Sequence, residues 1–146
     1  MTVSKAEYKK MTEKASPGTS CGKNMLMAFL FGGAICTLGQ LFRNLYLSWG
    51  LSVKEAGAFV SITLIFLSAF LTALRVYDNI AKYAGAGSLV PITGFANSIV
   101  APAMEFKQEG YVVGIGGKMF VIAGPVLVYA TASSILYGLI LYFFHL

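Results

Sequence analysis

The chain contains four long stretches without a charged side chain or histidine, separated by short polar segments. These uncharged runs cover residues 24–42, 56–74, 83–104 and 119–144, with lengths of 19, 19, 22 and 26 residues. A helix rises about 1.5 Å per residue, so roughly 20 apolar residues cross a hydrocarbon core about 30 Å thick. The pattern therefore predicts an all-α, polytopic integral membrane protein with four apolar segments. It divides into a polar N-terminal segment (1–23) and a membrane domain (24–146).

The polar N-terminal segment is basic. It holds five of the eleven Lys and Arg residues of the chain, namely Lys5, Lys9, Lys10, Lys14 and Lys23. Lysines that flank a first membrane span stay on the cytoplasmic side under the positive-inside rule. Residues 6–14 can form a short helix, which the sequence Ser-Pro-Gly-Thr-Ser at 16–20 ends. Two interpretations of that helix stay open, a helix on the membrane surface and part of a solvated tail.

The third run differs from the others because it is rich in helix-breaking residues. Between positions 85 and 98 it reads GAGSLVPITGFANS, with three glycines, Pro91 and several hydrogen-bonding side chains. Pro91 removes a backbone donor and clashes with the preceding turn, which frees carbonyl groups that lipid cannot pair. We therefore expect a broken segment that is buried in protein or lines water. It either crosses as a kinked span or returns to its starting side as a re-entrant pair of short helices.

Charge counting separates these two arrangements only weakly. If all four runs cross, the N-terminal side carries seven Lys and Arg residues and the other side four. If the third run is re-entrant, the split becomes nine against two, because Lys107 and Lys118 return to the N-terminal side. The second split obeys the positive-inside rule better, whereas four crossings is the simpler arrangement. The sequence leaves both open.

Composition and residue inventory argue against most catalytic chemistry. Hydrophobic residues make up 57% of the chain and charged residues 12%, where a soluble domain has about 25% charged residues. The net charge of +5 comes with no aromatic-rich basic groove, so it does not indicate a nucleic-acid partner. His145 is the only histidine and Asp78 the only aspartate, which argues against a zinc site, a Ser-His dyad and a paired-aspartate protease. We expect no enzyme activity, catalytic residue, cofactor or bound metal.

Polar side chains inside or beside the apolar runs are the candidates for function. Gln40, Thr93 and Asn97 lie inside apolar runs, where an amide or hydroxyl must find a partner or water. Glu105 and Lys107 lie beyond a run end, where long side chains reach the membrane interface. The predicted transport path consists of Gln40, Ser88, Pro91, Thr93, Gly94, Asn97, Glu105 and Lys107. The alternative is that the amides only hold helices together.

Several ordered strings resemble one known family. They are Gly32-Gly-Ala-Ile-Cys-Thr-Leu-Gly-Gln40, the segment from Gly85 to Ser98, Pro102-Ala-Met-Glu-Phe-Lys-Gln-Glu-Gly110, and Gly116-Gly-Lys-Met-Phe120 with Ala123-Gly-Pro125. Over about residues 20–144 the chain resembles the stage V sporulation AC/AEb family of endospore-forming bacteria, and its polar N-terminal extension is similar to the AC branch. The resemblance implies a multi-pass protein of the cell membrane, located in the inner membrane of the forespore and spore. It also implies a role in moving dipicolinic acid, with calcium, into the forespore and out at germination. Tension-gated channel activity is attributed to the AC branch.

The same resemblance implies partners from the stage V sporulation A operon, besides membrane lipid. These are the AEb protein and the soluble AD protein that binds dipicolinate. A dianionic pyridine dicarboxylate needs a wet, hydrogen-bonding path, and one chain of 146 residues is too small to enclose it. We therefore expect a homo- or hetero-oligomer in which this chain forms one wall of the conduit. The alternative function is a non-conducting scaffold subunit of the same complex.

The N-terminal lysines give a first prediction, that residues 1–23 lie on the cytoplasm-derived side of the membrane. A membrane-impermeant thiol reagent should label Cys21 when it is added to that side, because the five lysines resist translocation. The measurement is mass-tag labelling in membrane vesicles of the two orientations. Labelling of Cys21 from the opposite face alone would contradict the predicted orientation.

Overall fold

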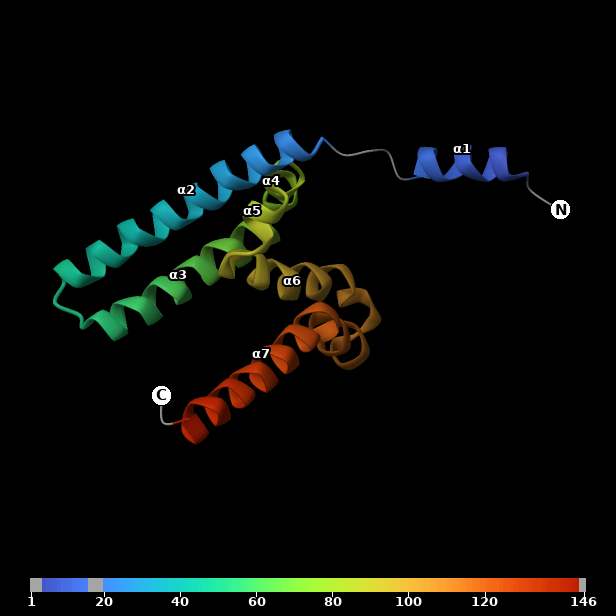
Figure 1. Ribbon diagram of the computed structural model, residues 1–146. Helices are drawn as coiled ribbons and strands as arrows, with labels where there is room; N and C mark the ends of the chain where they lie inside the picture. The colour runs from blue at the N-terminus through green and yellow to red at the C-terminus, as the bar shows by residue number, and fades with distance from the viewer. Residues whose placement is uncertain (1–3, 16–19, 145–146) are drawn as a thin grey trace.

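The computed structural model describes residues 4–15 and 20–144 (Figure 1). Within these ranges every regular element is helical, which confirms the all-α prediction and the short N-terminal helix. Residues 16–19 of the predicted helix-ending sequence and His145 lie outside the described residues. In chain order the elements are α1 (Lys5–Ala15), α2 (Cys21–Ser48), α3 (Val53–Ala73), α4 (Tyr77–Ala84), α5 (Ala86–Leu89), α6 (Ile92–Glu105), the 3-10 turn η1 (Lys107–Glu109), the π-helical η2 (Tyr111–Gly116) and α7 (Gly117–Phe144).

The helices α2 and α3 form an antiparallel hairpin (Figure 1). Ser52 caps the start of α3: its hydroxyl accepts a hydrogen bond from the Glu55 N–H at 3.4 Å, and the Glu55 carboxylate accepts one from the Ser52 N–H at 2.9 Å. This reciprocal capping box pairs two backbone donors that would otherwise be free at the helix start. Further along, the hydroxyl oxygens of Tyr46 and Thr63 lie 2.6 Å apart and join the two helices. The capping box therefore fixes the start of α3, and the Tyr46–Thr63 contact joins α3 to the last turn of α2.

The third apolar run is not one helix. The helix α4 ends at Ala84, α5 spans four residues, and α6 begins at Ile92 with Pro91 as its N-cap residue. Proline has no N–H to donate and a fixed φ, which suits the residue before a helix but not a helix interior. The extended ψ of Pro91, 165°, separates α5 from α6. The predicted broken segment is confirmed, and the proline lies at the break.

The broken segment turns back toward the end of α3 from which the chain came. Ser68 pairs with the Thr93 carbonyl, and Thr72, one turn later, pairs with Asn97. The helices α3 and α6 therefore run in the same direction where they touch. Thr93 therefore lies level with Ser68, which is about five residues, or ~8 Å of helix, before the end of α3. A full crossing needs about 30 Å. Of the two arrangements that the sequence leaves open, this geometry favours the re-entrant one.

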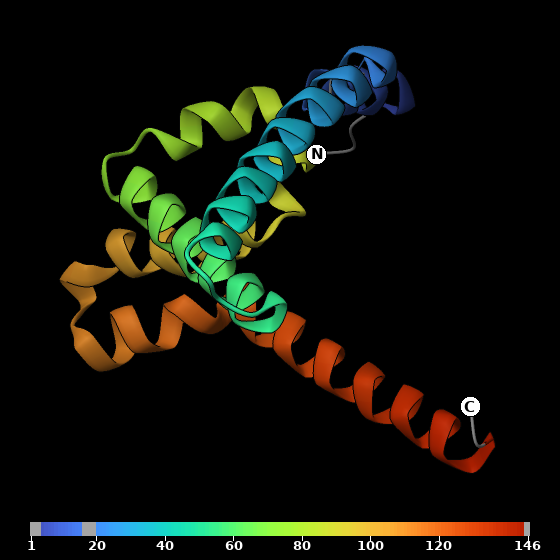
Figure 2. The same cartoon turned by 90° about the vertical axis from the view of Figure 1, so that its left-hand side faces the viewer.

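The last helix leaves the rest of the molecule at an angle. Figure 2 shows the C-terminal part of α7 pointing away from the α2–α3 hairpin, whereas its start packs against α6 and η2. At that start, Lys118 Nζ lies 4.5 Å from the centre of the Phe106 ring, which is a cation–π contact between the connector and the helix. The π-helical turn leads directly into α7, so one helical stretch runs from Tyr111 to Phe144. This stretch begins earlier than the uncharged run alone indicates.

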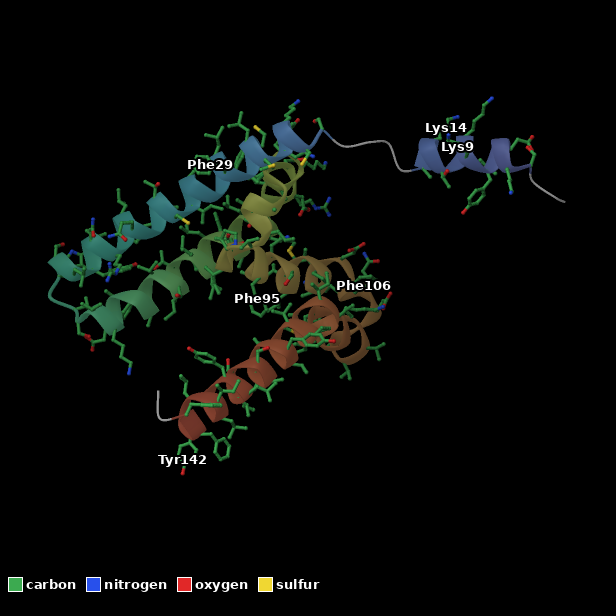
Figure 3. All side chains as sticks on the ribbon, viewed as in Figure 1. Lys9, Lys14, Phe29, Phe95, Phe106 and Tyr142 are labelled. Atoms are coloured by element: carbon green, nitrogen blue, oxygen red, sulfur yellow. The ribbon has the colours of Figure 1, made fainter. Side chains whose placement is uncertain are left out.

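Most large apolar side chains lie on the outside of the molecule. Phe29 on α2 and Tyr142 on α7 are 76% and 74% exposed, and Figure 3 shows them on the outer sides of their helices. Among the described residues, three helical stretches are long and apolar enough to cross a bilayer: α2, α3 and 111–144. Exposed apolar side chains on such helices are stable in hydrocarbon, where lipid surrounds them. The fold is that of a membrane protein with three candidate spans and a re-entrant segment.

The re-entrant arrangement predicts which side of the membrane each connector occupies. In a variant without its own cysteines (Cys21→Ser, Cys36→Ser), Asn79→Cys and Gln108→Cys should react with an impermeant thiol reagent from the same side, because the segment between them returns. Lys54→Cys, in the α2–α3 connector region, should react from the opposite side. Opposite labelling of positions 79 and 108 would instead require a full crossing between them.

Candidate functional site

A polar cluster joins the C-terminal half of α3 to the start of α6. Ser68 Oγ donates a hydrogen bond to the Thr93 carbonyl at 2.6 Å. The Thr72 hydroxyl lies 2.9 Å from Asn97 Oδ1 and 2.7 Å from the Ser68 carbonyl, so its single proton is shared between two acceptors. Ser68, Thr72 and Thr93 are buried and Asn97 is half-buried. Ser68 and Thr72 are four residues apart on α3, and Thr93 and Asn97 are four apart on α6. Each pair therefore lies on one face of its helix, and the two faces are in contact.

Hydroxyl groups from α3 and α4 hold both sides of the break. Tyr77, buried at the start of α4, donates its phenolic O–H to the Ser88 carbonyl at 2.8 Å. Ser88 Oγ in turn donates to the Gly85 carbonyl at 3.1 Å. On the other side of Pro91, Ser68 anchors the first turn of α6 through Thr93. A buried polar group without a partner costs about 1–3 kcal/mol, so these hydroxyls stabilise the broken shape.

Two glycines allow the backbone to pack closely around the break. A Cβ atom on Gly94 would collide with the Leu89 carbonyl, and one on Gly87 would collide with the Ala28 carbonyl. Any side chain at these positions would force two backbone segments apart. Gly94 therefore permits the turn between α5 and α6, and Gly87 permits the contact of α5 with α2.

The hydroxyl of Thr93 is an unpaired polar group beside the break. Among the described residues it is the one buried side-chain oxygen or nitrogen without a hydrogen-bond partner, and Thr93 is 6% exposed. Leaving a buried hydroxyl unpaired costs about 1–3 kcal/mol, which a water molecule or a polar solute atom would recover. Thr93 also lines a mostly apolar pocket of about 510 Å³, and its hydroxyl is the polar group there that has no partner among the described residues.

A polar pocket of about 410 Å³ adjoins the cluster at the end of α3. Its lining consists of Thr72, Arg75, Asp78, Ala101, Met104 and Glu105, from α3, α4, α6 and the turn between α3 and α4. One guanidinium and two carboxylates give the pocket binding groups for both anions and cations. Thr72 belongs to the pocket and to the cluster, so polar groups continue from the pocket toward Thr93.

Arg75 has a backbone conformation that residues other than glycine seldom adopt. Its φ is 59°, and it is the one non-glycine residue with a positive φ in the described ranges. Its N–H donates to the Thr72 carbonyl at 2.9 Å, and the Val76 N–H donates to the Leu71 carbonyl at 2.9 Å. These two bonds form a Schellman motif, in which glycine is the usual left-handed residue. Arginine in its place costs about 1–3 kcal/mol of strain, and it puts a guanidinium in the pocket wall.

The structure brings most of the predicted site residues together and leaves two apart. The break and the cluster contain Ser88, Pro91, Thr93, Gly94 and Asn97, and Glu105 lines the pocket. Gln40 is exposed on α2, where its Nε2 donates to Asn44 Oδ1 at 2.9 Å on the same helix. Lys107 is exposed in η1 and is not part of the pocket lining.

Sequence reasoning missed the residues that hold the break from α3 and α4. Ser68 and Thr72 carried a usable signal, because two hydroxyl residues one turn apart on an apolar run match the spacing of Thr93 and Asn97. Tyr77 carried no such signal, since it lies in a polar connector and a tyrosine there is expected at the membrane interface. The role of Arg75 depends on its backbone angle, which the sequence does not reveal.

Comparisons with known proteins decide the family. The SpoVAC/SpoVAEB sporulation membrane protein family matches residues 24–140. The chain belongs to the SpoVAC/SpoVAEB family. It is also similar to stage V sporulation protein AC of Bacillus subtilis (strain 168), with 41% identity over 145 residues, which is 99% of this chain and 97% of that protein. No solved structure matches it.

Membership in the SpoVAC/SpoVAEB family confirms the resemblance found in the sequence. The chain is a sporulation membrane protein, in agreement with its long apolar helices. The range that matches the SpoVAC/SpoVAEB family contains the polar cluster, the break and the whole lining of the pocket. The candidate site therefore lies in the part of the chain that carries the family likeness.

The hydrogen bond from Ser68 to Thr93 predicts a stability difference between two serines of α3. Ser68→Ala leaves the Thr93 carbonyl without this buried partner and should lower the free energy of unfolding by about 1–3 kcal/mol. Ser61→Ala is the matched control, because Ser61 is exposed and its hydroxyl bonds only the Gly57 carbonyl of its own helix. The measurement is thermal or denaturant unfolding of the purified proteins in detergent. Equal stability of the two variants would rule out the anchoring role of Ser68.

Proposed function

We propose that this chain is a membrane channel or transport subunit for dipicolinic acid, together with calcium. It acts in the inner membrane of the forespore and spore, in uptake into the forespore and in release at germination. The proposal includes gating by membrane tension. The family is one of sporulation membrane proteins. Dipicolinate with calcium as the solute, the inner spore membrane as the location and tension as the gating stimulus are parts of our proposal.

One observation carries the proposal, the continuity of polar groups from the pocket to the unpaired hydroxyl beside the break. Arg75 and Glu105 line the pocket, and the Thr72–Asn97 contact leads from it toward Thr93. A guanidinium binds a carboxylate with two parallel hydrogen bonds, and carboxylates are ligands of calcium. The path thus offers binding groups for both components of a calcium dipicolinate pair.

The polar groups line one side of a small bundle, so other chains must close the conduit. These are further copies of this chain or the AD and AEb proteins of the same operon. The helix α7 is exposed from Val126 to Ile140 and is available for such contacts. The proposed path comprises Ser88, Pro91, Thr93, Gly94, Asn97 and Glu105, to which we add Thr72 and Arg75.

A second function, that of a non-conducting scaffold subunit, is favoured by the hydrogen bonds within the break. Tyr77 already pairs the Ser88 carbonyl, and Ser68 already pairs the Thr93 carbonyl. Such pairing is expected of a segment that serves helix packing. In a scaffold, Asn97 holds α6 to α3 and never meets solute. The two functions therefore differ in what the loss of the Asn97 amide does.

Asn97→Leu tests the conduit. Leucine is of similar size and suits an apolar segment, but it removes the amide from the proposed path. We expect release of trapped dipicolinate with calcium, from liposomes that hold equal amounts of the purified membrane complex, to fall about 10- to 100-fold. This range corresponds to one lost hydrogen bond to a charged solute.

Gln40→Leu is the matched control, because Gln40 bonds Asn44 on the exposed side of α2. Its efflux should equal that of the wild type. Wild-type efflux from the Asn97→Leu protein, accompanied by a lower melting temperature, would reject the conduit and support the scaffold.

A further inference from the structure

Two cavities lie along one side of α2, where α4 and α5 pack against it. The first has a volume of about 390 Å³, and its lining includes Cys21, Asn24, Ala28, Lys82, Tyr83 and Ala86. The second has a volume of about 290 Å³, and its lining includes Ala28, Gly32, Cys36, Gly87, Val90 and Pro91. Ala28 and Ala86 line both cavities, so the two lie next to each other along α2, and together we call them the α2 groove.

The chemistry of the α2 groove changes along its length. Near the start of α2 its walls carry an ammonium group from Lys82, an amide from Asn24 and a phenol from Tyr83. Beyond Ala28 the described lining has no charged side chain, and it ends on Val90 and Pro91 at the break. One end of the groove is therefore polar and cationic, and the other is apolar.

The backbone adds to the cationic character of the polar end. Ser20, the N-cap residue of α2, makes no side-chain capping bond. The first N–H groups of a helix have no partner within the helix itself. The helix dipole places a partial positive charge at the same point. Lys82 and the start of α2 thus form complementary walls for a phosphate group.

The apolar end decides which class of molecule fits. A small dianion such as dipicolinate would lose its hydration there and find no partner for its carboxylates. A phospholipid matches both ends, because its phosphate is anionic and its acyl chain is apolar. The helix α2 is one of the candidate spans, so the groove lies where lipid is available.

We infer that the α2 groove binds one anionic phospholipid. Its phosphate lies against Lys82 and the first turn of α2, and one acyl chain follows Gly32 and Cys36 to Pro91. The groove shares only Pro91 with the proposed solute path, and the inference does not depend on that function. The bound chain supports the break from the α2 side, while Ser68 supports it from the α3 side.

Lipid binding to the full-length protein in detergent tests the polar end. The probes are phosphatidylglycerol and phosphatidylcholine with identical acyl chains, and the readout is lipid adducts in native mass spectrometry. Lys82→Gln should weaken phosphatidylglycerol binding about tenfold, as expected for the loss of a charge-assisted hydrogen bond, and should weaken phosphatidylcholine binding less, because the choline cation offsets the charge of the same phosphate. Lys54→Gln, at the other end of the hairpin, should change neither.

Cys36→Phe tests the apolar end, because the larger side chain fills the second cavity. It should weaken binding of both lipids, whereas Thr37→Phe, on an adjacent exposed position of α2, should not. Helical circular dichroism and monodispersity identify folded variants, and if Cys36→Phe fails to fold, Lys82→Gln decides alone. Unchanged lipid binding in Lys82→Gln overturns the inference. So does a smaller oligomer of Cys36→Phe with unchanged lipid binding, which would mean that a second copy fills the groove.

Discussion

Every backbone polar group inside a bilayer needs a partner within the protein, and the break at Pro91 is where this constraint is hardest to satisfy. The carbonyl of Ser88 receives its partner from Tyr77, and the first turn of α6 is fixed by Ser68. These two hydroxyls require α4 to fold back onto the break and α6 to begin level with the last turns of α3. The shallow, re-entrant course of the chain follows from that requirement.

Mostly apolar pockets lie on both sides of the break. On the α3 side, Ser68, Ser88 and Thr93 line a pocket of about 510 Å³ whose other walls are apolar. On the α2 side, Gly32 and Cys36 line an apolar cavity that reaches Pro91 itself. The close backbone packing at Gly87 and Gly94 leaves the segment between these pockets little room to shift.

Much of the fold could be predicted from the sequence, because uncharged runs of membrane length and a proline within one of them are unambiguous signals. The re-entrant course could not, since run length and the positive-inside rule allowed two arrangements. The partners of Thr93 and Asn97 were also hidden, because one sequence does not reveal which helices touch. Gln40 bonds Asn44 one turn away on its own helix, a local pairing that the spacing of four residues allows.

The helix α7 packs against the rest of the chain only near its start, within the described residues, and Ala123 is its buried residue. From Val126 to Ile140 every residue faces outward. Substitutions there exchange one apolar surface for another and leave the internal packing of the subunit untouched. What surrounds the subunit, lipid or a neighbouring chain, therefore decides which side chains this stretch can carry, while the fold of the subunit stays the same.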